Sequence, residues 1–185
     1  MSYANTFSPN GFRPLMGDAI KSLKTIRRPV LANRAKTASA TETILSVHDA
    51  YTLDANGNAL HAGPNDVVFG IVLALELEAV PTIMNGNGPV SVDQMLTAYA
   101  GAIIGIEDTN AYFEVQTDNF NTNNENGLFN LVDALANTLF RQSQQSITTG
   151  AAGVQFRAID IVNRPTDNAY GANARAIVRL SQAVA

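Results

Sequence analysis

Cysteine and tryptophan are both absent from this 185-residue chain, and histidine occurs only at His48 and His61. Without cysteine the chain has no disulfides, no thiolate nucleophile and no cysteine-ligated metal site. Two histidines leave little for imidazole catalysis. A long apolar run is also missing, because the longest apolar-rich stretch, residues 67–80, is interrupted by one glycine and two glutamates. That stretch is too short and too charged for a transmembrane helix, so we expect no membrane partner.

Lysine is absent after Lys36, and the chain is divided by charge. Residues 1–41 contain seven basic side chains and one acidic side chain, whereas the remainder contains five arginines and fifteen carboxylates. The formal charges of the two parts are therefore +6 and −10, which together give the net charge of −4. A basic segment on an acidic body favours an anionic partner, either a nucleic acid or an acidic protein surface.

Prolines interrupt the first 41 residues. Pro9, Pro14 and Pro29 cannot donate a backbone hydrogen bond, and each biases the preceding residue toward extended geometry. The apolar residues of this segment stand singly, so the segment cannot build a core of its own. We therefore predict an extended basic N-terminal arm over residues 1–41, which lies along the body or docks on a neighbour, and a β-rich body over residues 42–185.

The body carries the periodicity of β-structure. The Asn56–Gly57 step favours a tight hairpin turn, because both residues tolerate positive φ. Leu73, Leu75 and Leu77 alternate with alanine and glutamate, which predicts a half-buried strand with these leucines on the buried face. Further strands are expected within residues 111–116, 154–162 and 176–180.

One segment fits two kinds of structure. The apolar spacing after residue 128 suits a helix, but Asn130, Asn137 and Thr138 weaken that reading, so helix and strand both stay open over residues 128–146. Before it, residues 118–127 are rich in asparagine and are expected to form a loop. The predicted fold class is mainly β: a small β-barrel or sandwich-like body with a long extended N-terminal arm and, in the helical alternative, one short helix near 128–140.

No motif assembles a catalytic centre. Ser46, His48 and Asp49 are the residue types of a hydrolytic triad, but on a strand Asp49 points to the face opposite the other two. Residues 54–58 resemble the start of a calcium loop, yet the glycine is one place early and Asn65 stands where a bidentate glutamate is needed. We therefore expect no enzyme, no cofactor and no metal site.

The basic residues of the arm permit two partners. Lys24, Arg27 and Arg28 would give salt-dependent affinity if they contacted phosphates. The arm lacks the interleaved aromatic residues on which single-stranded bases stack. Docking on protein is therefore the favoured reading, and nucleic acid is not the expected partner.

Three segments, in order along the chain, resemble a family of small structural proteins of tailed bacteriophages. They are residues 4–14 (ANTFSPNGFRP), residues 107–116, where an acidic turn precedes a strand with Phe-Glu-x-Gln, and residues 156–171, which begin FRAIDIVNRP. The chain departs from this family in two places. Its middle region, which includes residues 73–77, lacks the aromatic, glycine-rich strand pair that is usual in the family, and the pattern after residue 128 is more helical than expected. The resemblance implies a capsid decoration (cement) protein on the outer capsid surface of a virion.

The resemblance also implies the partners. They are the major capsid protein and further copies of this chain, as a homo-oligomer that is expected to be a trimer. The arm would cross neighbouring capsid subunits, with apolar residues entering pockets and basic residues facing acidic surface. The candidate interface residues are Phe7, Phe12, Arg13, Leu15, Lys24, Arg27 and Arg28. Two other functions stay open: a receptor-binding or fibre-type adhesin, which predicts affinity for a host glycan, and an internal DNA-facing virion protein, which predicts salt-sensitive DNA binding.

Overall fold

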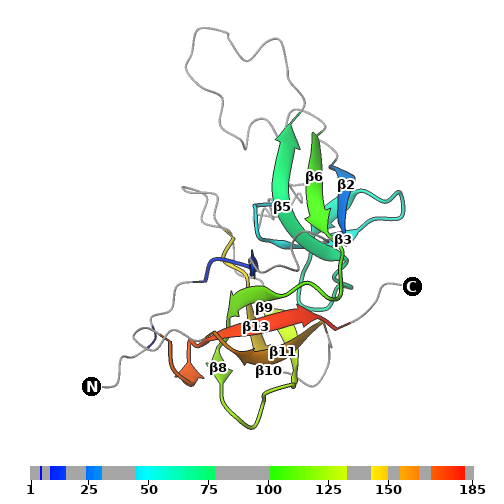
Figure 1. Ribbon diagram of the computed structural model, residues 1–185. Coiled ribbons are helices and arrows are strands. Elements are labelled where there is room, and N and C mark those ends of the chain that lie inside the picture. The colour runs from blue at the N-terminus through cyan, green and yellow to red at the C-terminus, as the bar shows by residue number, and fades with distance from the viewer. Residues whose placement is uncertain are drawn as a thin grey trace, which may run out of the picture.

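The computed structural model describes residues 5, 9–15, 24–30, 45–77, 101–132, 143–149, 155–162 and 168–181. Within these ranges every regular element is a strand. The strands are β1 (Arg13–Pro14), β2 (Thr25–Val30), β3 (Ala50–Leu53), β4 (Ala59–His61), β5 (Gly70–Leu77), β6 (Gly101–Ile106), β7 (Phe113–Gln116), β8 (Asn119–Phe120), β9 (Leu128–Val132), β10 (Ser146–Thr149), β11 (Phe156–Ile161), β12 (Gly171–Ala172) and β13 (Arg175–Leu180). The predicted mainly β fold is confirmed (Figure 1). The described part of the chain contains no helix of the length and apolarity needed to cross a membrane.

Six strands form an antiparallel sheet in the order β1-β7-β13-β11-β9-β10. The sheet curls until β10 reaches the end of β7, where Thr117 makes a parallel bridge to Ile147 and the Asp118 N–H donates to the Ile147 carbonyl at 3.1 Å. At the other end of β7, Arg13 of β1 pairs with Glu114. Strands β7, β13, β11, β9 and β10 thus enclose a small barrel, in the lower half of Figure 1, consistent with the expected barrel or sandwich-like body.

Phenylalanine side chains fill the interior of this barrel. Inward and outward residues alternate along each strand, so every second side chain points into the core. In β13 the alanine, valine and leucine at alternate positions are buried, while the residues between them are partly exposed. The fully buried rings are those of Phe12, Phe113, Phe120, Phe129 and Phe156. Phe12 stacks on Phe156, with ring centroids 4.4 Å apart and an angle of 18° between the planes. Ile71 and Ile106 continue this core into the second sheet.

The second antiparallel sheet has the order β2-β6-β5-β3-β4, with β5 and β6 as a long pair in the upper half of Figure 1. Strand β4 comes back against β2, so the sheet folds around a small core of its own. The buried residues of that core are Val30, Leu45, Tyr51, Ala59, Val72 and Ile103. The hairpin between β3 and β4 turns at the predicted Asn56–Gly57 step, where Gly57 has a φ of 80°. The hairpin is where it was predicted, but the last pair is Leu53 with Ala59, so the loop has five residues, 54–58, and of the Asn-Gly step only Gly57 has a positive φ.

Strand β5 is present as predicted, but its face is not. The ladder between β5 and β6 shifts between Val72 and Ala74, so Leu73 is an inserted residue. Because a bulge interrupts the alternation, Ile71 and Val72 are both buried, whereas Leu73 is 38% exposed. The expectation that Leu73 shares the buried face with the leucines after it is therefore wrong.

Strands β7, β11 and β13 confirm the strands expected within residues 111–116, 154–162 and 176–180. Residues 128–132 form β9, so the strand alternative holds at the start of the ambiguous segment, and residues 133–142 lie outside the described ranges. The stretch expected to be a loop contains the short strand β8, which pairs with β12.

The segment predicted as an arm contributes two strands to these sheets. Strand β1 pairs with β7, and β2 pairs with β6 over its full length, from Thr25 opposite Ile106 to Val30 opposite Gly101. The described part of the segment therefore lies along the body, one of the two placements that were predicted. Residues 1–4, 6–8, 16–23 and 31–41 lie outside the described residues, and the boundary at residue 41 stays a prediction.

Candidate functional site

The residue types of the hydrolytic triad occur in the turn before β3. The buried Asp49 accepts the Ser46 N–H at Oδ2, 2.6 Å away. His48 has a left-handed backbone, with a φ of 74°, and its carbonyl accepts the Phe12 N–H at 2.8 Å. Burial, together with the charge of Arg13, lowers the pKa of the His48 imidazole. These contacts shape the turn and hold the N-terminal segment on it.

A buried amide joins the two sheets. The side chain of Gln145, directly before β10, accepts the Ala50 N–H at 2.6 Å and donates to the Ala62 carbonyl at 3.2 Å. The His61 ring lies 3.1 Å from the Gln145 amide nitrogen and 3.8 Å from Asp49 Oδ2. Because the His61 and Asp49 side chains are 4% and 1% exposed, a substrate has no access to them. This cluster is a structural joint.

A charged network closes one end of the second sheet. Arg28 donates through Nε and one terminal nitrogen to both Glu107 oxygens, each at 2.7 Å, and the Tyr51 hydroxyl donates to Glu107 Oε1 at 2.7 Å. Burial raises the pKa of Tyr51 far above its ordinary value. Burial alone would also raise the pKa of Glu107, but the hydrogen bonds from Arg28 and Tyr51 outweigh it and hold that pKa below its ordinary value. The network therefore ties β2 to β3 and to the end of β6.

The apolar interface candidates have different environments. Phe7 lies outside the described residues. Phe12 is 0% exposed and stacked within the core of its own chain, so contact with a second protein would require its ring to leave that core. Leu15 follows β1, is partly exposed, and donates its N–H to the Tyr112 carbonyl at 3.0 Å. Of the two that the structure describes, Leu15 is the accessible one.

The basic candidates are divided between the two sheets. Arg13 is exposed on β1, and Lys24 is exposed just before β2. Arg27 is exposed and pairs with Glu76 of β5 at 2.7 Å, whereas Arg28 is engaged by Glu107. Two of the four basic candidates are therefore already occupied by carboxylates of this chain.

The strand register places one line of outward side chains across the barrel. Arg157 of β11 is opposite Arg179 of β13 on one side and Leu128 of β9 on the other. Val178 is opposite Phe113, so in the same register the next pair along the two strands is Arg179 with Tyr112. Arg13 is opposite Glu114, so two residues further Leu15 is opposite Tyr112, as their backbone hydrogen bond requires.

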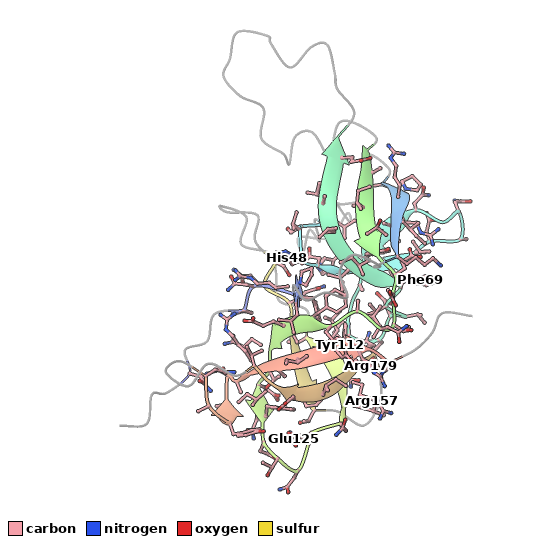
Figure 2. The ribbon with its side chains drawn as sticks, in the orientation of Figure 1. His48, Phe69, Tyr112, Glu125, Arg157 and Arg179 are labelled. Carbon is pink, nitrogen blue, oxygen red and sulfur yellow. The ribbon has the colours of Figure 1, made fainter. Side chains whose placement is uncertain are left out.

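We name this line the outer row; it consists of Leu15, Tyr112, Arg179, Arg157 and Leu128. Opposed residues of an antiparallel pair share one face, so all five side chains point away from the core. Tyr112 is 43% exposed and Leu128 is 38% exposed, which is high for large apolar side chains. Figure 2 shows Tyr112, Arg179 and Arg157 on neighbouring strands of the barrel. The row combines exposed apolar side chains with two arginines on one face of the sheet.

The two arginines of the outer row are not neutralised within the described part of the chain. Neither guanidinium makes a hydrogen bond or an ion pair there. By contrast, Arg175, two register steps along β13, binds Glu114 at 2.9 Å. The row thus presents two guanidinium groups, flanked by apolar side chains.

Four of these five residues were not anticipated from the sequence. Tyr112, Leu128, Arg157 and Arg179 come from four different strands or strand ends, and their adjacency depends on register. One local sign was available: Arg175, Ile177 and Arg179 alternate with buried residues along β13, which marks them as outward. Nothing local indicates that Arg157 lies opposite Arg179.

Comparisons with protein-family models, with curated proteins and with solved structures find no match for this chain. The family resemblance inferred from the three segments therefore stays a prediction. In the described part of the chain, no group of three or more histidine, aspartate or glutamate side chains is arranged to hold a metal ion. The outer row is the candidate functional site, because its exposed tyrosine and opposed arginines suit binding to a protein surface.

Proposed function

We propose that this chain is a non-enzymatic structural protein of a tailed-phage virion, which binds the outer capsid surface and cements neighbouring major capsid subunits. The outer row carries the proposal, because tyrosine and arginine are the side chains enriched at the energetic centre of protein interfaces. The three segments that resemble phage decoration proteins support the virion role separately.

The barrel strands that carry the outer row form a rigid base, which suits a binding function. Adjacent strands lie about 4.8 Å apart, so five positions on neighbouring strands extend roughly 19 Å along the sheet. Because the barrel surface curves, the middle of the row, Tyr112, Arg179 and Arg157, is the part that can face one partner. The strands close into a barrel with a phenylalanine core, so the backbone of the site is ordered before binding. Binding therefore costs little conformational entropy.

The N-terminal segment enters the proposal through Leu15. It lies at one end of the outer row, and the chain continues from there into residues 16–23, which the structure does not describe. A homo-oligomer, trimeric as the family resemblance implies, would present several rows to the shell at once. Linked copies multiply a weak single-chain contact through effective concentration.

The DNA-facing alternative receives less support. Arg27 and Arg28 would have to exchange Glu76 and Glu107 for phosphates, and in Arg28 that exchange breaks a two-pronged contact. A glycan-binding adhesin would use the same exposed Tyr112, since aromatic rings also bind sugars. Affinity for capsid shells rather than for glycans distinguishes the two roles.

The test is co-sedimentation of the full chain with undecorated, expanded capsid shells. Wild-type protein is expected to bind saturably, and Tyr112→Ala is expected to weaken binding about tenfold, as truncation of a central interface tyrosine does. Tyr170→Ala is the matched control: Tyr170 is equally exposed, at 44%, but stacks on Phe120 next to β12 rather than in the outer row.

Two results would contradict the proposal. Failure of the wild-type chain to bind shells at moderate salt would remove the capsid role, and glycan and DNA binding would then be tested. Equal binding by wild type and Tyr112→Ala, with both variants folded, would remove the outer row as the contact surface. Point variants are preferable to deletion of residues 1–41, because that deletion also removes β1, β2 and the buried Phe12.

A further inference from the structure

Two positively charged side chains lie next to each other on the outer surface of the barrel. Arg157 and Arg179 are directly opposed on adjacent antiparallel strands, where side chains lie about 5 Å apart at their Cβ atoms. Opposed like charges destabilise a sheet, and no carboxylate in the described part of the chain relieves this pair. An anion placed between the two guanidinium groups would relieve the repulsion.

The neighbouring positions limit which anion fits. One step along the same face, the register aligns Asp160 with Ile177 and Ile177 with Glu114. Asp160 is exposed and would repel a polyanion that extends along this face, whereas Glu114 is buried and already bound by Arg175. A nucleic acid needs several basic contacts along its backbone, but on this face Arg175 is bound by Glu114, and the exposed Arg13 lies two strands away from Arg179. A single compact anion therefore suits the arginine pair better than a long one.

The flanks of the arginine pair are apolar. Tyr112 lies beside Arg179, and Leu128 lies beside Arg157. Apolar partner groups packed on these side chains would exclude water and strengthen the charge contact between them. Arginine recognises carboxylates through two parallel hydrogen bonds, which a planar carboxylate between two guanidiniums can satisfy.

We infer that Arg157 and Arg179 form a clamp for one carboxylate side chain, presented by an acidic, partly apolar segment of the protein partner. This inference rests on the proposed function only in naming the capsid surface as that partner. The arginines in the middle of the outer row would then select a partner carboxylate, and the apolar side chains beside them would contact apolar groups of the partner.

The first test uses the full chain and fluorescence anisotropy of a labelled peptide in which leucine and glutamate alternate. We expect saturable, salt-sensitive binding, and about tenfold weaker binding of the same peptide with glutamine in place of glutamate. The Arg157→Gln/Arg179→Gln double variant should lose the preference for glutamate. The matched control is Asn56→Asp/Asn65→Asp, which shifts the net charge by the same amount at two exposed turn positions away from the outer row.

A second variant separates charge from shape. Arg157→Lys/Arg179→Lys keeps both charges but loses the planar guanidinium fork, so several-fold weaker binding is expected. Unchanged binding by this variant would contradict a clamp. Binding of a labelled 20-base-pair duplex DNA in preference to the glutamate peptide would also overturn the inference.

Thermal stability distinguishes a binding role from a structural one. Removing the opposed charges in Arg157→Gln/Arg179→Gln should leave the Tm unchanged or raise it, by up to about 4 °C. A lower Tm would indicate that the arginines stabilise the fold, and the inference would fail.

Co-sedimentation with shells separates this inference from the proposed function. Shell binding that is unaffected by Arg157→Gln/Arg179→Gln would overturn the clamp and leave the capsid role intact. Glutamate-selective peptide binding without any shell binding would support the clamp and contradict the capsid role.

Discussion

Replacement of Phe12 by alanine tests how the N-terminal segment is held. Its ring is 0% exposed and stacks on Phe156 at 4.4 Å, in the shared core of the barrel. Truncation of a buried phenylalanine costs about 3–5 kcal/mol of unfolding free energy, which includes the cavity left behind. For a domain of this size, 1 kcal/mol shifts the Tm by about 2–4 °C, so a decrease of about 6–20 °C is expected.

The assay is urea and thermal unfolding followed by far-ultraviolet circular dichroism, because the chain has no tryptophan to report on its core. Phe12→Leu keeps most of the buried volume and should lose less than half as much stability. Leu15→Ala, three residues later and partly exposed, should change stability by less than about 1 kcal/mol. Unfolding of Phe12→Ala at the wild-type midpoint would refute the placement of this ring in the core.

Gly105→Ala should destabilise the second sheet by about 1–3 kcal/mol in urea unfolding, because its Cβ would overlap the hydroxyl group of the buried Tyr51. Gly63→Ala is the control: its Cβ would have its nearest neighbour at 3.4 Å, so it should be close to neutral. Gln145→Leu leaves a buried backbone amide without its acceptor and should cost about 1–3 kcal/mol in the same assay, and a neutral result would contradict the joint between the sheets. The lowered pKa of Glu107 contributes stability that is present above its ordinary value of 4.5 and lost as pH falls through the lowered value. Glu107→Gln should therefore flatten the acid side of a plot of Tm against pH, and an unchanged slope would contradict this assignment.

The parts of the fold that follow from local chemistry were predictable. A turn at Asn56–Gly57 depends on positive φ at Gly57, and the strand over residues 113–116 depends on its residue types. Both are properties of a few consecutive residues, so the sequence alone is enough to predict them.

Strand β2 was predicted only as extended chain. Its residues alternate between more and less exposed positions. The sequence does not show this alternation, because Arg27, Arg28 and Pro29 are not apolar residues at alternate positions. Its place at the edge of the sheet comes from pairing with β6, more than 70 residues later in the sequence. Such pairing is a long-range property that local periodicity does not contain.

The bulge at Leu73 and the outer row have a related origin. An inserted residue changes which face later side chains occupy, and no residue type in β5 marks the insertion. Likewise, Arg157 and Arg179 belong to strands whose sequences do not specify their register with each other. The candidate site thus emerges from strand pairing, whereas the residues proposed from the sequence alone came from one continuous segment.

The most direct test of the central claim, that the outer row contacts the capsid, is site-specific photo-crosslinking. The full chain with p-benzoylphenylalanine in place of Tyr112 would be bound to undecorated, expanded capsid shells and irradiated, with the same substitution at Tyr170 as control. We expect a covalent adduct with the major capsid protein from position 112 and little from position 170. Saturable binding to shells with no adduct from position 112, or with equal adducts from both positions, would contradict it.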